Sequence, residues 1–173
     1  MARPNLSRAR RVARQLHQKH LGEPTARPVD VEQIIVGEGI SLRKESLEYG
    51  TFGIYMRQEG RRAIVVDPFQ QGAQRLLFTL AHELGHASLL DKDGCLVDGY
   101  RKRDALSTMG THRDEVEANA FAAELLMPET LIRELAERAG RVEESDVRGL
   151  AKKFGVSPMA MTVRLNSMGF FIW

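Results

Sequence analysis

The sequence has almost no cysteine, no long apolar run and almost no excess charge, and each absence narrows what the protein can be. Only one of its 173 residues is a cysteine, Cys95, which excludes an intrachain disulfide and favours a reducing compartment. No apolar run approaches the length of a membrane-spanning helix. The basic amino terminus lacks an apolar signal core, so we expect a cytoplasmic protein without membrane association.

The net charge of +2 is too small to indicate nucleic-acid binding by itself, but the positive charge is unevenly placed. The first twenty residues contain no acid and six basic side chains, Arg3, Arg8, Arg10, Arg11, Arg14 and Lys19. These side chains form either the solvated face of a helix or a docking patch for nucleic acid or an acidic partner.

Hydrophobic periodicity and turn residues predict a mixture of helices and short strands, an α+β protein. Helices are expected over 5–20, 30–35, 72–90, 112–126, 128–139, 145–154 and 157–168, and strands over 40–44, 51–56 and 62–67, with the closing FFIW as a further candidate strand. The connection over 91–111 is long and polar, which indicates a lid, a specificity loop or disorder.

The stretch FTLAHELGHASLL, residues 78–90, carries two histidines at helical spacing. Residues i and i+4 share a helix face, so His82 and His86 point the same way, and their separation suits one tetrahedral zinc ion. Glu83 is rotated by about 100° from His82, where it can reach a water at the metal without being a ligand. The apolar residues around them predict a buried helix. The alternative is a pair of hydrogen-bonded core histidines beside a chance glutamate.

A catalytic zinc site needs a third protein ligand and leaves its fourth position to water. Leu89 and Lys92 stand where a metzincin would have glycine and histidine, so the third ligand must come from further along the chain. The best donors lie in DEVEANAFAAELLMP, residues 114–128.

Glu115 is the residue we choose as third ligand. A helical wheel of about 100° per residue places Glu115 in the middle of an apolar face, and Glu117 and Glu124 on an opposite, solvent face. A lone carboxylate on an apolar face needs a cation, and the small Ala118 beside it would let another helix approach closely. Glu117 is the weaker choice, because solvation accounts for it. An internal salt bridge, for instance to Arg75, is the alternative for Glu115.

Other residues near these motifs carry weaker signals. His112 and Tyr100 are candidates for stabilising an oxyanion, although a histidine in solvent at a helix start is the favoured interpretation of His112. Cys95 is interpreted as a small buried residue or a loop thiol, because a zinc-ligand role would want a second cysteine nearby.

FTLAHELGH, followed in order by EVEANAFAAELLMP, resembles the ImmA/IrrE family of zinc metallopeptidases. The resemblance runs roughly over residues 28–170 and includes the tail LAKKFGVSPMAMTVRLNSMG. It implies a zincin-like metallopeptidase core in which a small three-stranded sheet packs against helices. We therefore expect one unit over 1–173, with a basic helix and linker at 1–27, the zinc-binding catalytic core at 28–128 and a helix-turn-helix-like helical subdomain at 129–173.

The resemblance also implies a function. Members of the family are bacterial or phage zinc endopeptidases that cleave a partner helix-turn-helix transcription repressor, which relieves repression in mobile-element transfer or in the stress response to DNA damage. The family's Zn²⁺ histidines correspond to His82 and His86, its catalytic glutamate to Glu83 and its glutamate ligand to Glu115.

Two further features bear on how partners bind. An extended substrate can add to a sheet edge, and RAIVV at 62–66 is either that edge or an interior strand. The tail has helix-turn-helix spacing, but Met159, Ala160 and Met161 precede Arg164 where a base-reading helix would carry polar side chains. The tail therefore favours a packing or protein-contact surface over DNA binding. A repressor-cleaving peptidase, a non-proteolytic metal-containing regulator and a DNA-binding protein remain as function classes, in that order.

Overall fold

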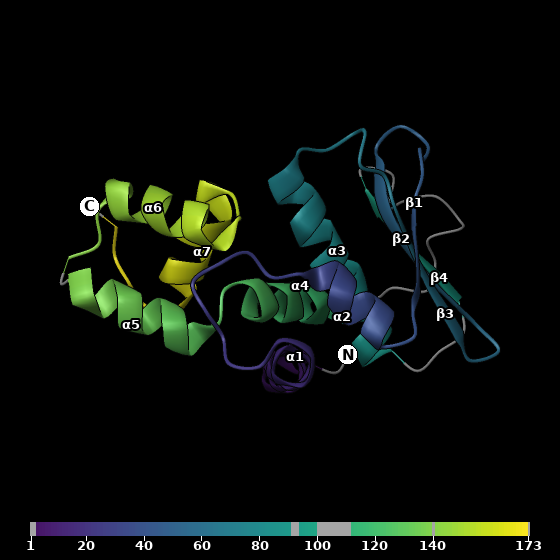
Figure 1. The fold of residues 1–173 in the computed structure, drawn as a ribbon, viewed down its shortest axis with the longest axis horizontal. Helices are drawn as coiled ribbons and strands as arrows, with labels where there is room; N and C mark the ends of the chain where they lie inside the picture. The colour runs from purple at the N-terminus through teal and green to yellow at the C-terminus, as the bar shows by residue number, and fades with distance from the viewer. Residues whose placement is uncertain (1–2, 91–93, 100–111, 140, 173) are drawn as a thin grey trace.

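The computed structural model of the chain describes residues 3–90, 94–99, 112–139 and 141–172 (Figure 1). In chain order its elements are α1 (Leu6–Leu21), α2 (Val31–Gly37), β1 (Ser41–Lys44), β2 (Thr51–Gln58), β3 (Arg61–Val66), α3 (Ala73–Leu89), β4 (Gly94–Gly99), α4 (His112–Leu126), α5 (Glu129–Ala139), α6 (Glu144–Phe154) and α7 (Pro158–Ser167). The predicted α+β class is confirmed. Within the described ranges, no helix is both long and apolar enough to span a membrane.

The strands form one sheet with the order β1-β3-β2-β4. β2 and β3 are antiparallel and joined by Glu59 and Gly60, whose positive φ angles of 49° and 79° give the twist that a two-residue hairpin needs. β1 runs parallel to β3, and β4 runs antiparallel to β2. β4 is one strand more than expected, and it lies within the predicted 91–111 connection. Its sequence, GCLVDG, shows no clear alternation, so the strand becomes visible only through its pairing with β2.

The sheet order corrects one expectation about the substrate. RAIVV belongs to β3, which pairs with β1 on one side and β2 on the other. It is therefore an interior strand, and its interpretation as a substrate-binding edge is wrong. Among the described strands, β1 and β4 are the edges of the sheet.

Helix α3 lies at the centre of the molecule, between the sheet and the other helices (Figure 1). One face of α3 packs on β2 and β3, and it also contacts α1, α2 and α4. Residues 79–87 are all buried, which confirms the expectation of a buried helix. The active-site candidates on α3 therefore stand on an element that is held from several sides.

The predicted solvent face of α4 is wrong, because Glu117 and Glu124 are both buried. Glu117 accepts hydrogen bonds from the backbone N–H of Asn5 and from Nε of Arg113, each at 2.7 Å. Burial alone would raise the pKa of Glu117, but these donors lower it below its ordinary value. Helix α1 covers this side of α4. A helical wheel identifies a polar face, but it does not show whether that face contacts water or basic side chains of the protein.

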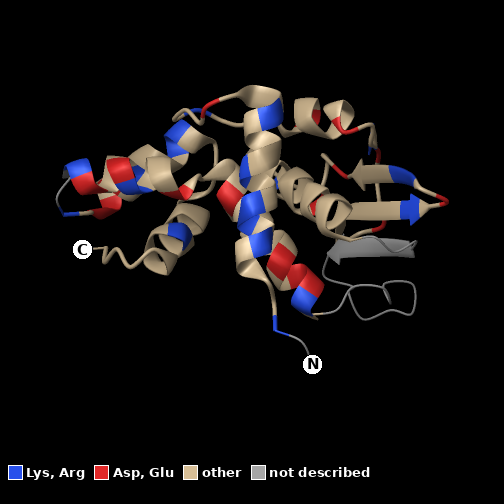
Figure 2. Ribbon diagram, turned by 90° about the horizontal axis from the view of Figure 1, so that it is seen from below, with Lys and Arg blue, Asp and Glu red and all other residues tan. Residues whose placement is uncertain are grey.

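The basic residues of α1 are spread along the helix, as Figure 2 shows. Arg8 donates to the carbonyl of Leu89, Arg14 pairs with Glu124 at 3.0 Å, and Lys19 pairs with Glu38 at 2.6 Å. Arg10 lies 3.8 Å from Glu129. Arg3 and Arg11 are exposed. The side chains of Arg14 and Lys19 are nevertheless 52% and 61% exposed, so much of the cluster is solvated, as one interpretation expected, while several members also bind the protein's own acids and carbonyls.

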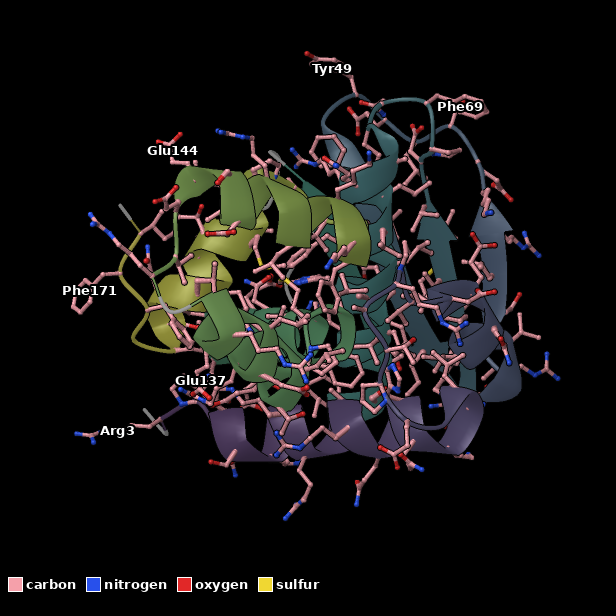
Figure 3. All side chains as sticks on the ribbon, turned by 60° about the vertical axis from the view of Figure 1, so that its left-hand side comes forward. Arg3, Tyr49, Phe69, Glu137, Glu144 and Phe171 are labelled. Carbon is pink, nitrogen blue, oxygen red and sulfur yellow. The ribbon has the colours of Figure 1, made fainter. Side chains whose placement is uncertain are left out.

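Helices α5, α6 and α7 form the end of the molecule opposite the sheet (Figure 1). Gly155, in the left-handed region with φ 69°, ends α6, and Ser157 caps α7, which gives the predicted helix-turn-helix spacing. Arg164 is buried and donates to Glu124 and to the carbonyl of Met127. It is therefore a packing residue, as the sequence favoured, and the pair fixes α7 to α4. Phe171 projects outward beyond α7 (Figure 3).

Candidate metal centre

Two imidazole rings meet on the buried side of α3. His82 and His86 lie one turn apart, with ring centroids 4.6 Å apart and ring planes at 87°. Their Nε2 atoms are 3.0 Å from each other. Both side chains are nearly inaccessible to solvent. The spacing predicted from sequence thus brings the two ring nitrogens to one point.

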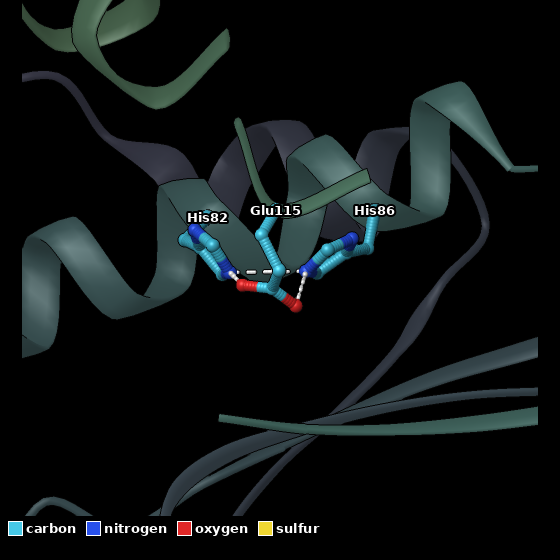
Figure 4. A group of neighbouring side chains, drawn as sticks. All are labelled: His82, His86 and Glu115. Atoms are coloured by element: carbon cyan, nitrogen blue, oxygen red, sulfur yellow. Dashed lines mark hydrogen bonds and ion pairs between the residues drawn. The ribbon is translucent and has the colours of Figure 1, made fainter. Parts of the chain in front are cut away.

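Glu115, in the first turn of α4, completes a group of three (Figure 4). Its Oε2 lies 3.4 Å from Nε2 of His82, and its Oε1 lies 3.4 Å from Nε2 of His86. The Glu115 side chain is 23% exposed, whereas those of His82 and His86 are 4% and 2% exposed. Glu115 therefore faces the two histidines, whereas Glu117 faces α1.

Small residues allow α4 to come this close to α3. A methyl group added at Gly85 would lie 3.1 Å from Cα of Ala118 and 3.2 Å from its carbonyl oxygen. The backbones of the two helices therefore nearly touch at this point. The expected close helix approach at Ala118 is confirmed, and Gly85 of the HELGH motif is its counterpart on α3.

The chemistry of the three donors fits a divalent metal. Zinc–nitrogen bonds of about 2.0–2.1 Å at tetrahedral angles place ligand atoms about 3.3–3.4 Å apart. The Nε2 atoms of His82 and His86 are 3.0 Å apart, and each lies 3.4 Å from a different oxygen of Glu115. In the described part of the chain these three form the group of His, Cys, Asp and Glu residues that could hold a metal ion.

Asn119 sets the proton on His82. Its Oδ1 lies 3.0 Å from Nδ1 of His82, and because an amide oxygen only accepts, Nδ1 carries the hydrogen. Nε2 of His82 then keeps its lone pair and points into the cluster. Such partners of metal-binding histidines fix ring orientation and tautomer. The sequence alone assigns Asn119 no role, although it lies one helical turn after Glu115 on α4.

Glu83 is completely buried on the sheet side of the same turn. Its carboxylate lies against β2, so that a methyl group at Gly53 would come within 2.7 Å of its Oε1. It is not among the three clustered donors. Glu83 thus follows His82 directly in the chain without joining the cluster, and its role as a base stays a prediction.

The remaining candidates fall elsewhere. His112 is exposed at the start of α4, in keeping with a histidine in solvent. Arg75 stacks its guanidinium over the ring of Phe52, 3.8 Å from the centroid. Tyr100 lies outside the described residues, and so does the side chain of Cys95, whose backbone pairs with Met56 in the sheet.

Comparison with known families agrees with this geometry. The model of a peptidase family described as the IrrE N-terminal-like domain matches residues 38–166, more than half of the chain. The chain belongs to this family. The resemblance to ImmA/IrrE metallopeptidases is thereby confirmed. Membership in the family supports a metal-dependent protease, and the cluster on α3 and α4 offers the donors for that metal.

Two relatives illustrate the range of the IrrE-like family. The chain is 39% identical over 90 residues to the radiation response metalloprotease IrrE of Deinococcus radiodurans. The aligned segment covers 49% of this chain and 25% of that protein. The chain is also 30% identical over 108 residues to the uncharacterized immunity region protein 2 of Bacillus phage phi105. This aligned segment covers 62% of this chain and 63% of that protein. The matched part is thus a quarter of the first relative's length and under two thirds of the second's.

Proposed function

We propose that the protein is a zinc-dependent endopeptidase, with His82, His86 and Glu115 as zinc ligands and Glu83 as the general base. The observation that carries the proposal is the convergence of two imidazole nitrogens and one carboxylate, with contacts of 3.0 to 3.4 Å, together with a second, fully buried carboxylate, that of Glu83, on the same turn of α3. A structural zinc site is closed by four protein ligands, whereas three ligands leave a position open for water.

The residues have separate tasks in the proposed reaction. When bound, a zinc ion supplies Lewis acidity toward a water molecule and the scissile carbonyl. Glu83 accepts the proton that the attacking water loses and delivers it to the leaving amine nitrogen. Burial keeps Glu83 in one place while it does so. Asn119 holds His82 in the tautomer whose Nε2 can bind metal.

We propose a helix-turn-helix transcription repressor as the substrate. This rests on the family, and the two relatives are named for a radiation response and for a phage immunity region. Cleavage would relieve repression of the genes that the repressor controls. An extended segment of the repressor would enter beside α3 by adding to an exposed strand edge, and the described edges are β1 and β4.

The test is cleavage of purified helix-turn-helix repressors encoded near the protein's gene. We expect wild type with zinc to cut one of them at one site, and chelator-treated protein to leave it intact. Glu83→Gln should keep zinc and lose activity by about 10²–10⁴-fold, the usual contribution of a general base. If Glu83→Gln cuts as fast as wild type, the assignment of the base is wrong.

A non-proteolytic regulator that acts through α7 is the second candidate. Met159 and Val163 lie one turn apart on α7 and are 72% and 60% exposed, as a protein-contact surface would be. Such a regulator has no use for a base beside the cluster. Relief of repression by Glu83→Gln, with the repressor uncut, would favour this function over the peptidase. DNA reading by α7 is not favoured, because Arg164 is buried.

A further inference from the structure

Gly53 on β2 lies closer to α3 than any residue with a side chain could. A Cβ at this position would stand 2.7 Å from Oε1 of Glu83, 3.0 Å from Cγ of Glu83 and 2.8 Å from Cγ2 of Thr79. The φ angle of Gly53 is outside the left-handed region, so backbone conformation does not require glycine there. The lack of space requires glycine, because Thr79 and Glu83 lie on successive turns of α3, on the buried face that packs against Gly53.

The strand is fixed at this short distance by hydrogen bonds around one glutamine. Oγ1 of Thr79 donates to Oε1 of Gln71 at 2.9 Å. Nε2 of Gln71 donates in turn to the carbonyls of Phe52, at 3.0 Å, and Asp67, at 2.7 Å. The next residue along β2 from Phe52 is Gly53. Thr79, which Gly53 approaches on α3, is thus linked by hydrogen bonds through Gln71 to Phe52, the neighbour of Gly53 on β2.

The sheet itself is irregular at this point. Thr51 pairs with Gly99 and Gly53 pairs with Asp98, so Phe52 is an extra residue on β2, as in a β-bulge. On the other side, the N–H of Asp67 donates to the carbonyl of Phe52 at 3.0 Å. Bulges re-aim a strand locally and are frequent beside active sites. Here the bulge directly precedes the residue that meets Glu83.

We propose that Gly53 is a positioning residue for the catalytic base: by having no side chain, it lets β2 confine the Glu83 carboxylate next to the metal ligands. This rests on the proposed function, in which Glu83 is the base. Because Glu83 is completely buried, a methyl group at Gly53 would push its carboxylate into atoms that already surround it. A misplacement of about 1 Å in a catalytic group can cost about 10²-fold in rate.

The first arm of the test uses metal-free protein and needs no substrate. The urea midpoint of Gly53→Ala should fall, whereas Gly72→Ala should leave it nearly unchanged, because a Cβ there meets no atom within 4 Å. In a Glu83→Ala background the same Gly53→Ala change should lower the midpoint by less than half as much. Equal losses in both backgrounds would show that the methyl group does not meet Glu83, and would overturn the proposal.

The second arm measures zinc content, kcat and KM with the repressor cut by wild type. Gly53→Ala should keep its zinc and its KM and lose about 10- to 100-fold in kcat. Gly53→Ala/Thr79→Ser should regain part of that loss, because serine removes Cγ2 and keeps the hydroxyl that bonds Gln71. This double variant also carries the test if Gly53→Ala alone fails to fold.

The outcomes separate this proposal from the one on which it rests. Wild-type kcat in Gly53→Ala, with Glu83→Gln inactive, overturns the positioning role and leaves the peptidase assignment standing. Loss of zinc in Gly53→Ala also overturns it, because the glycine would then maintain the metal cluster and not the base. Wild-type kcat in Glu83→Gln removes the base assignment and the positioning role together.

Discussion

Helix α4 carries buried or half-buried carboxylates on two sides, and the two sides meet different neighbours. Glu124 is buried between Arg14 and Arg164, which are permanent cations. Glu115 meets Nε2 of His82 and of His86, and His82 presents a lone pair there because its Nδ1 bonds Asn119. A carboxylate between two arginines is neutralised by the protein itself, whereas one beside two imidazole nitrogens is suited to share a metal ion with them. The same residue type thus anchors structure on one side of α4 and, in the proposed site, binds metal on the other.

The largest effect should come from breaking the arginine side. Arg164→Ala leaves the buried Glu124 with one basic partner, Arg14, whose side chain is 52% exposed, and with the long N–H contact of Glu129 at 3.5 Å. Removing one partner of a buried ion pair costs about 3–5 kcal/mol, and we expect a loss of that order in urea unfolding. Zinc per folded chain should not change, because no ligand is touched.

Arg148→Ala is the matched control for this change. Arg148 pairs with Glu144 at 3.2 Å, and both side chains are mostly exposed. A surface pair of this kind contributes less than about 1 kcal/mol. Similar losses for Arg148→Ala and Arg164→Ala would contradict the view that Glu124 depends on its buried arginine.

A smaller effect should follow from loosening the histidine side. Asn119→Ala removes the acceptor that holds the proton on Nδ1 of His82. Loss of such a partner typically lowers metal affinity by about 10- to 100-fold. Competition for zinc against a chromogenic chelator would measure it. Asn119→Asp keeps an acceptor and should stay close to wild type, and an unchanged affinity in Asn119→Ala would exclude the orienting role.

The smallest effect concerns Asp67, a carboxylate whose hydrogen-bond donors are backbone N–H groups and the amide of Gln70. Asp67 accepts from the N–H groups of Leu47, Phe69 and Gln70, which joins the loops that carry the exposed Tyr49 and Phe69 (Figure 3). These bonds, led by that of Leu47, hold the pKa of Asp67 below its ordinary value. Its contribution to stability is therefore complete above the unfolded pKa of about 3.9 and is lost as pH falls through the lower folded value.

Asp67→Asn should accordingly be less stable than wild type at neutral pH, and the difference should shrink as pH falls below about 4. Urea midpoints of the two proteins across this range would measure the change. A difference that stays constant with pH would mean that the charge of Asp67 contributes nothing.

The sequence located the cluster because its signals are local. The spacing of one helical turn was sufficient to predict that His82 and His86 point the same way. The pattern of apolar residues on α4 was sufficient to select Glu115. The burial of Glu117 and Glu124 was missed because a partner of each is distant in sequence: Asn5 lies 112 positions from Glu117, and Arg164 lies 40 from Glu124. The contact of Gly53 with Glu83 was hidden for a related reason, because it depends on how β2 packs against α3.

The most direct test of the account compares the zinc content of Glu115→Gln and Glu117→Gln after dialysis against a weak chelator. The two variants make the same chemical change two positions apart on α4. Glu115 faces the histidines, and Glu117 faces α1. Wild type and Glu117→Gln should each retain about one zinc per chain, and Glu115→Gln should lose it, as a three-ligand site requires. Full zinc in Glu115→Gln, or loss of zinc from folded Glu117→Gln, would contradict the assignment of Glu115 as the third ligand.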